Sequence, residues 1–231
     1  DRCTSRGLGD VYKRQTDGGQ ESTEIFKSHN FQTHESFEAL NCDNSLSIVE
    51  SLNINGSVFF ESAKLIGVDS ENESMLINTG CLLEAVQKTE VLGTGGSKTI
   101  DFGIGLLSKL GMEFVSNGET IVNPVPKDFS YIDQIKTTNF KSNLENRILS
   151  DTNISLLGEN SAFDVFGPQK GLSEKDIEKH KLEVERLITL IDKELVLGLN
   201  PTEINSGAAG GLTFALNQIL AVKLKTVQNT F

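Results

Sequence analysis

The sequence contains few of the residues that build disulfide frameworks, zinc sites or membrane anchors. Its 231 residues include three Cys, three His, four Pro, two Tyr and no Trp. Cys3, Cys42 and Cys81 are odd in number and form no C-x-x-C pair, which argues against a disulfide framework and against zinc. No apolar run has the length of a membrane span, and the first residues lack the apolar stretch of a signal peptide. These absences predict a soluble protein of a reducing, cytoplasmic compartment, with no membrane partner.

Acidic residues outnumber basic ones, and this narrows the classes of partner. The chain has 32 Asp and Glu against 21 Lys and Arg, a formal net charge of −11. Phosphate backbones repel such a chain, so we expect no nucleic-acid partner. Phe alone occurs 13 times, in periodic apolar segments, which excludes disorder along the whole length. The length suits one large domain, or one domain and part of another.

Both ends of the sequence differ from what lies between them. Residues 1–15 carry four basic against two acidic residues and show neither helix nor strand periodicity. We interpret them as a non-native or disordered leader. At the other end, residues 225–231 stop without a capping glycine or a polar tail. We therefore expect the chain to be a truncated fragment of a longer protein.

Periodic apolar positions predict strands that alternate with helices. Residues 44–60 alternate around Asn55-Gly56, a two-residue step typical of a hairpin. The longest helix is predicted at 174–197, where Ser173 and Asp176 form a capping box. Shorter strands are predicted at 57–61, 88–92, 112–115 and 142–149, and a shorter helix at 104–110. This alternation indicates an α/β fold.

The most informative segment is the glycine loop at 93–97, which follows a predicted strand. Glycines let a ligand approach the backbone, and a helix start beyond them offers N–H groups to an anion. Gly95, Gly96 and Ser97 are therefore candidate anion-binding residues, although a plain tight turn explains the same pattern. Asp101 also has two interpretations. Its spacing favours a helix cap, and the alternative is a general base for a substrate hydroxyl or a magnesium ligand.

Two further glycine-rich segments have both a structural and a ligand-binding interpretation. In residues 165–171, Lys170 directly precedes the long helix, where its charge opposes the helix dipole. An anionic ligand would explain this lysine, and an ordinary surface lysine is the alternative. Residues 207–211 hold too much glycine for a helix interior. This segment, with Gly207 and Gly210, opens a last predicted helix. The helix either packs closely on a neighbour or turns its N-terminus to a ligand.

Carboxylates at turns complete the set of candidates. Asp17-Gly18-Gly19 forms a turn that suits either a metal–nucleotide complex or plain solvation. Asp151 follows a predicted strand, and α/β proteins place ligands at the carboxyl ends of strands. No role is assigned to His29, His34 or His180, the last of which is expected on the charged, solvated face of the long helix.

Six segments of the sequence, taken in chain order, resemble the type I glycerate kinases. They are Asp17 to Thr23, Asn78-Thr79-Gly80, Gly93 to Ser97, Asp101, Phe166 to Gly171, and Gly207 to Leu212. The resemblance implies a two-domain α/β architecture, in which the second domain is inserted into a Rossmann- or flavodoxin-like first domain and the active site lies between them. It divides the chain into a leader (1–15), a fragment of the first domain (16–45), the inserted α/β domain (46–215) and the start of the return to the first domain (216–231).

The resemblance also implies an activity. Family members transfer the γ-phosphoryl group of ATP to a hydroxyl of D-glycerate, with Mg²⁺, so ATP and Mg²⁺ are the expected cofactors and glycerate the expected small-molecule partner. Asp101 and Asp151 would then be the catalytic residues. The substrate- or phosphate-binding residues would be Asp17, Gly18, Gly19, Gly95, Gly96, Ser97, Lys170, Gly207 and Gly210.

The sequence departs from the family pattern next to both carboxylates. Ile100 and Phe102 replace the usual Asn and Gly beside Asp101, and Asn153 and Ile154 replace a second Asp and an Asn. The family's opening Asp-Ser-Phe-Lys-Gly motif and its later Gly-Glu-Gly-Arg motif are also absent. These departures leave a second hypothesis, a noncatalytic carboxylate-binding or interaction domain derived from the kinase fold.

Overall fold

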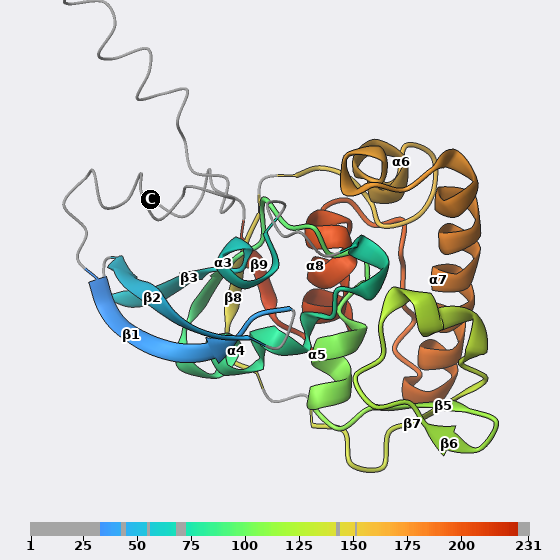
Figure 1. Cartoon of the computed structure of the whole chain (residues 1–231), viewed down its shortest axis with the longest axis horizontal. Coiled ribbons are helices and arrows are strands. Elements are labelled where there is room, and N and C mark those ends of the chain that lie inside the picture. Colours follow the sequence, from blue (N-terminus) through green and yellow to red (C-terminus); the bar gives the residue numbers. More distant parts are fainter. Residues whose placement is uncertain are drawn as a thin grey trace, which may run out of the picture.

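The fold consists of a sheet and a mostly helical part that lie side by side (Figure 1). The computed structural model describes residues 33–42, 45–54, 56–67, 73–141, 144–150 and 152–225. Figure 1 shows α5, α6, α7 and α8 on one side of the molecule and the larger sheet on the other. Parallel strands joined by helices confirm the predicted α/β class.

The larger sheet has six strands in the order β1-β2-β3-β4-β8-β9. The pairs β1–β2 and β2–β3 are antiparallel, whereas β3, β4, β8 and β9 run parallel. The strands are β1 (Thr33–Leu40), β2 (Leu46–Ile54), β3 (Ser57–Glu61), β4 (Val91–Gly93), β8 (Arg147–Leu149) and β9 (Lys223–Lys225). Because the parallel strands share one direction, their carboxyl ends and the loops that follow meet at one edge of the sheet.

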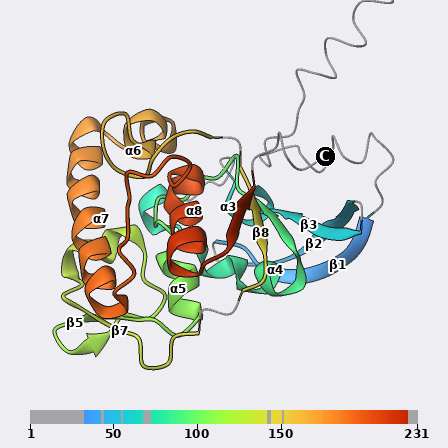
Figure 2. The same ribbon diagram turned by 180° about the vertical axis from the view of Figure 1, so that it is seen from behind.

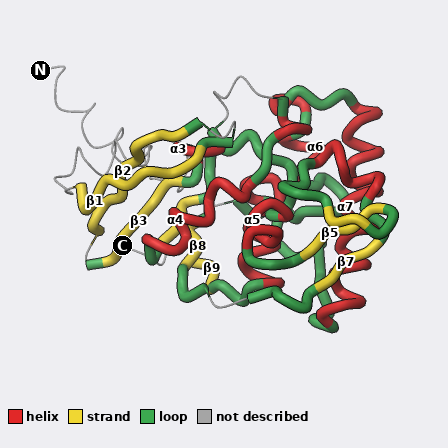
Figure 3. Tube along the Cα trace, turned by 60° about the horizontal axis from the view of Figure 1, so that its bottom comes forward, coloured by secondary structure: helices red, strands yellow, loops and turns green. Residues whose placement is uncertain are grey.

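A second, three-stranded sheet lies at the edge of the helical part, which Figures 2 and 3 show from two further sides. Its strands are β5 (Glu113–Ser116), β6 (Glu119–Thr120) and β7 (Gln134–Lys136). The α-helices of the chain are α3 (Ala63–Ile66), α4 (Leu83–Lys88), α5 (Ile104–Lys109), α6 (Ala162–Phe166), α7 (Glu174–Leu195) and α8 (Leu212–Phe214). Short 3-10 turns are η1 (Ser74–Leu76), η2 (Thr79–Leu82), η3 (Pro126–Tyr131), η4 (Pro168–Lys170) and η5 (Ala208–Gly211), and η6 (Ala215–Ile219) is a π-helical turn.

The predicted hairpin is confirmed. Ile54 pairs with Ser57, so the connection is the two-residue step, and Gly56 has a φ of +84°, which glycine adopts without a steric penalty. Two predicted strands are shorter than expected. The strand predicted at 88–92 begins later, as β4, because α4 continues to Lys88, and of the described residues 144–149 only Arg147–Leu149 form β8.

One continuous apolar core joins the sheet to the helices. Phe60, Leu92 and Ile148 from adjacent strands belong to the same buried cluster as Leu187 of α7 and Phe214 of α8. A smaller cluster of Leu52, Ile54, Phe59 and Leu149 forms on the other face of the sheet, because successive side chains of a strand point to opposite faces.

The long helix α7 begins and packs as predicted, with one exception. The Ser173 hydroxyl accepts from the Asp176 N–H, and the Asp176 carboxylate accepts from the Ser173 N–H, which is the expected capping box. Its apolar residues Ile177, Val184, Leu187, Ile188 and Ile191 are buried, whereas Leu182 is exposed. The expectation that His180 lies on the solvated face is wrong: its side chain is buried, and Nε2 lies 2.8 Å from the carbonyl oxygen of Ile100.

The expected division into domains stays a prediction. The larger sheet takes β1 from 16–45, then β2, β3, β4 and β8 from 46–215, and β9 from 216–231. In the part of the chain that the structure describes, no helix combines the length and apolar character that crossing a membrane requires.

Candidate functional site

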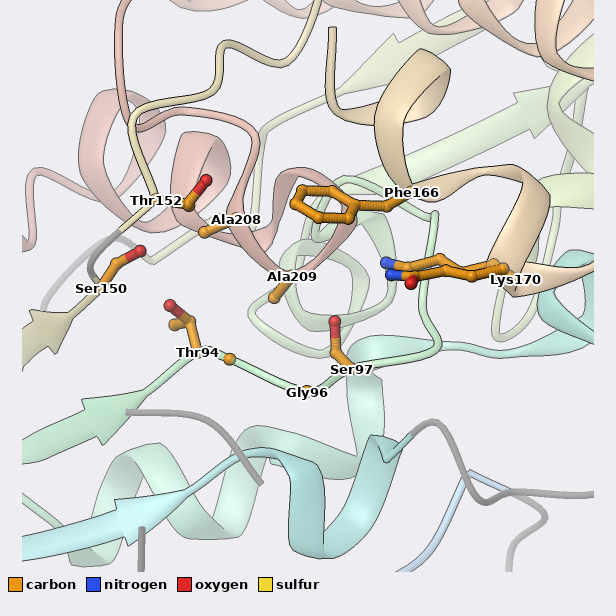
Figure 4. A pocket seen from close by; sticks show the side chains of 11 residues that line it. Thr94, Gly96, Ser97, Ser150, Thr152, Phe166, Lys170, Ala208 and Ala209 are labelled. Carbon is orange, nitrogen blue, oxygen red and sulfur yellow. The ribbon is translucent and has the colours of Figure 1, made fainter. Parts of the chain in front are cut away.

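A pocket of about 170 Å³ lies beyond the carboxyl ends of β4 and β8, where the loops after these strands face η4 and η5. Figure 4 shows Lys170 entering from one side, with the hydroxyls of Thr94, Ser150 and Thr152 across the pocket from it. The residues that line it are Thr94, Gly95, Gly96, Ser97, Ser150, Thr152, Phe166, Gln169, Lys170, Ala208 and Ala209.

The pocket brings together predicted residues from two distant segments of the chain. Gly95, Gly96 and Ser97 come from the glycine loop, and Lys170 comes from η4. Gly96 has a φ of +70°, a backbone conformation that side chains disfavour, so the loop depends on glycine there. The predicted anion-binding loop and the predicted cation therefore line one pocket.

The glycine-rich segment 207–211 packs closely and also borders the pocket. A Cβ on Gly210 would lie 1.9 Å from the carbonyl oxygen of Thr99, and one on Gly207 would lie 2.6 Å from its nearest neighbours. This confirms the close-packing interpretation of both glycines. The residues between them, Ala208 and Ala209, line the pocket, whereas Gly207 and Gly210 are not among its lining residues.

Lys170 is a buried cation. Its side chain is 6% exposed, and its Nζ donates a hydrogen bond of 2.8 Å to the carbonyl oxygen of Thr99. Burial lowers the pKa of Lys170 from 10.5 to about 8, and the negative charge of Asp101 acts in the opposite direction. The side chain is therefore mostly protonated at neutral pH, in surroundings that strengthen its attraction for an anion.

Several pocket residues were not among the sequence candidates. Thr94, Ser150 and Thr152 supply hydroxyl groups, and Phe166 and Gln169 supply part of the wall. Each one adjoins a segment that the sequence did single out. Thr94, Ser150 and Thr152 could have been identified by their position just after β4 and β8, because ligands of α/β proteins bind beyond the carboxyl ends of strands.

The hydrogen bonds of Asp101 favour the capping interpretation over the catalytic one. Its carboxylate is completely buried and does not line the pocket. Oδ2 accepts from the N–H and hydroxyl of Thr79 and from the N–H of Gly105, and Oδ1 accepts from the Thr99 hydroxyl and the N–H of Gly103. Five donors occupy the lone pairs that a base or a metal ligand would need.

The remaining sequence candidates lie outside the described residues. These are Asp17, Gly18, Gly19 and Asp151, whose roles stay predictions. Among the residues that the structure does describe, no group of three or more His, Cys, Asp or Glu side chains forms a metal site. The described lining of the pocket contains no carboxylate, whereas Asp151, between the lining residues Ser150 and Thr152, lies outside the described residues.

The two departures beside Asp101 are core residues. Ile100 is buried, and its carbonyl oxygen is the partner of His180. Phe102 has a φ of +38° and packs edge-to-face on Phe129, with ring centroids 5.6 Å apart. Phe102 stands where the resembled family usually has glycine. Its backbone keeps a conformation that suits glycine, while its ring fills the core.

The chemistry of the pocket is that of a site for a small anion. A buried ammonium, several hydroxyls and a glycine loop with a closely approachable backbone are donors for carboxylate or phosphate oxygens.

Comparison with known proteins agrees with this chemistry. A sequence model of the glycerate kinase family matches residues 7–230, beginning inside the segment 1–15 that we interpret as a leader. A glycerate kinase of Bacillus subtilis (strain 168) is 31% identical over 172 residues, which are 70% of this chain and 44% of that protein. A glycerate 2-kinase of Escherichia coli (strain K12) is 27% identical over 184 residues, covering 74% of this chain and 48% of that protein.

Among solved structures, a Salmonella typhimurium LT2 protein with the provisional name glycerate kinase 2 has the same fold. The TM-score is 0.76 at 22% identity, over 92% of this chain and 62% of that chain. The chain spans about half the length of the glycerate kinase of Bacillus subtilis and of the glycerate 2-kinase of Escherichia coli. Because the family match extends over nearly its whole length, the chain belongs to the glycerate kinase family.

Proposed function

We propose that the protein represented by this chain is a glycerate kinase, which transfers a phosphoryl group from ATP to a hydroxyl of D-glycerate. The observation that carries the proposal is the pocket in which Lys170 faces the Gly95–Ser97 loop. Family membership supplies the reaction type, and the pocket supplies a place for the anionic substrate. We also propose a cytoplasmic location, which rests on the cysteine pattern.

In this proposal the pocket binds the carboxylate of glycerate. The Lys170 ammonium neutralises the carboxylate, while the Ser97 hydroxyl and the backbone N–H groups of Gly95 and Gly96 donate to its oxygens. Binding at one end of this short molecule orients the hydroxyls at the other end. Phosphoryl transfer depends largely on such positioning and on charge neutralisation.

ATP and Mg²⁺ enter the proposal through family resemblance. When bound, the magnesium ion would neutralise charge on the phosphates of ATP. The described pocket residues offer no carboxylate to it, so Asp17 and Asp151 remain the proposed contacts. Because the carboxylate of Asp101 is occupied by protein donors, Asp151 is also the remaining candidate for the catalytic base.

The competing hypothesis of a noncatalytic anion-binding domain uses the same pocket. It predicts binding of D-glycerate without turnover. The replaced residues Asn153 and Ile154, close to Asp151, are the observation that supports it. The intact pocket alone does not separate the two hypotheses, because both need an anion site.

The test is an ATP-dependent phosphorylation assay with D-glycerate. It uses this chain, a version extended at both ends to the length of the relatives, and Lys170→Met in each. Lys193→Met, which removes an exposed lysine of α7, is the matched control. The kinase proposal expects phosphoglycerate from the extended protein and none from its Lys170→Met variant. A folded extended protein that binds D-glycerate but gives no product would establish the binding-domain hypothesis instead.

A further inference from the structure

Asp101 lies outside the pocket, but one residue connects it to the pocket cation. The Thr99 hydroxyl donates to Asp101 Oδ1 at 2.8 Å, and the carbonyl oxygen of the same Thr99 accepts from Lys170 Nζ at 2.8 Å. All three residues are buried. The side chain of Thr99 thus faces the carboxylate while its backbone holds the ammonium.

The carbonyl of Thr99 is enclosed from other directions as well. Gly210 packs against it so closely that any Cβ there would collide with the oxygen. The next carbonyl, that of Ile100, lies 2.8 Å from His180 Nε2 on α7. The N–H of Phe102 donates to the carbonyl of Gly210 at 3.1 Å. Residues 99–102 are therefore fixed between α7 and η5.

The backbone of Lys170 is held independently of Thr99. Its carbonyl oxygen accepts from the Ser74 hydroxyl at 2.5 Å, and its N–H donates to the carbonyl of Gly167 at 3.0 Å. These bonds fix the backbone of Lys170. The position of its Nζ depends on the separate bond to the carbonyl oxygen of Thr99.

Charge provides a second connection between the Asp101 carboxylate and the Lys170 ammonium. Burying an ammonium without a counter-charge is costly, and the described lining of the pocket contains no carboxylate. Among the residues that the structure describes, Asp101 is the acidic group whose charge acts on Lys170. Since its carboxylate is held by five protein donors, that charge stays in one place.

We propose that Asp101 is a positioning residue for substrate binding, which acts through Thr99 to hold the Lys170 ammonium at the pocket. The substrate part of this inference rests on the proposed function. In it, Asp101 never touches the substrate and takes no proton from it. Its loss therefore weakens substrate binding because Lys170 is no longer held in place.

The test compares four variants of the full chain. Thr99→Val removes the hydroxyl and keeps the shape of the side chain, and Thr99→Ser restores the hydroxyl. Asp101→Asn removes the charge. The matched control is Asp176→Asn, another aspartate that caps a helix, located at the start of α7. Circular dichroism and thermal unfolding verify that each variant is folded, and Thr99→Val keeps the test valid where Asp101→Asn fails to fold.

The first readout is the rate at which acetic anhydride acylates Lys170, mapped by mass spectrometry against the other lysines. We expect this rate to rise about tenfold in both Thr99→Val and Asp101→Asn. In Thr99→Val the carbonyl of residue 99 is no longer fixed by the bond to Asp101, and in Asp101→Asn the ammonium loses its counter-charge. Thr99→Ser and Asp176→Asn should match wild type. An unchanged rate in folded Thr99→Val would overturn the proposal, whether or not D-glycerate binds.

The second readout is the affinity for D-glycerate, measured by calorimetry. Thr99→Val and Asp101→Asn should raise Kd about tenfold, and Thr99→Ser should restore it. A wild-type chain that binds no D-glycerate would contradict the proposed function, and the acylation rates would still decide the positioning role. In the extended enzyme, KM should rise more than kcat falls. A loss of kcat alone would instead identify Asp101 as a participant in the chemistry.

Discussion

The ammonium of Lys170 lies 2.8 Å from the carbonyl oxygen of Thr99, a residue 71 positions earlier in the chain. This bond joins η4 to the end of the glycine loop and places the cation of one segment beside the backbone of another. Buried lysines are rare unless paired, so the contact and the nearby Asp101 charge explain how this one is accommodated. The remaining donor capacity of the ammonium is then available to an anion.

Removal of the cation should abolish most anion binding. Lys170→Met keeps much of the side-chain volume and deletes the charge, and a lost bond to a charged group should weaken D-glycerate binding about tenfold or more. Calorimetry on Lys170→Met and on the exposed control Lys193→Met measures this. Equal affinity of Lys170→Met and wild type would remove Lys170 from the binding site.

Anion affinity should decline above about pH 8. The protonated form of Lys170 attracts an anion, and its pKa is about 8, so the charge is lost as pH rises through that value. Above it, Kd should increase about tenfold per pH unit. Calorimetry between pH 6.5 and 9.5, values chosen to bracket this pKa, follows the decline. The Lys170→Met variant should lack the step, and a wild-type affinity that is flat across this range would contradict the prediction.

Stability should fall in mild acid because of His180. Burial lowers the pKa of His180 from 6.5 to about 4 in the folded protein. In the unfolded chain His180 is protonated below about pH 6.5, whereas in the folded protein it is protonated only below about pH 4. The free energy of unfolding should decrease by about 1.4 kcal/mol per pH unit within this window.

Urea unfolding at several pH values measures that slope. His180→Phe keeps an aromatic ring between Phe129 and Phe163, which contact His180 in the wild type. This variant should have a shallower slope between pH 6.5 and 5, where the charge of His180 changes only in the unfolded chain. The same slope in both proteins would assign the pH dependence to other groups.

A methyl group at Gly210 should damage both the fold and the pocket. Gly210 has a φ of +60°, and a Cβ there would lie 1.9 Å from the Thr99 oxygen. Gly210→Ala should cost more than about 2 kcal/mol of stability, since both strain and a collision contribute. Gly198 is the matched control, because its φ is +72° and its added Cβ would meet nothing within 4 Å. Gly198→Ala should cost about 1 kcal/mol, and similar losses in both variants would disprove the collision.

Local signals in the sequence predicted much of the fold. The Asn55-Gly56 step and the capping box at Ser173 both depend on residues close together in the chain, and the structure confirms them. The glycine loop and Lys170 were likewise identified as candidates, and one pocket holds them. Local chemistry is what sequence patterns report most directly.

Long-range contacts could not be predicted from these patterns. His180 occupies a polar position in the helix periodicity, yet it is buried because Ile100, 80 positions earlier in the chain, provides its partner. The donors to Asp101 come partly from Thr79, a residue of η2. Spacing alone suggested the cap but could not show that Thr99 connects this carboxylate to Lys170.

The most direct test of the pocket assignment is a nitrogen–proton correlation NMR titration of the chain with D-glycerate. The assignment predicts the largest amide shifts at Gly95, Gly96 and Ser97, with smaller ones at Ala208 and Ala209, and their loss in the Lys170→Met variant. Saturable shifts confined to another part of the molecule would contradict it, and so would a folded chain whose spectrum D-glycerate leaves unchanged.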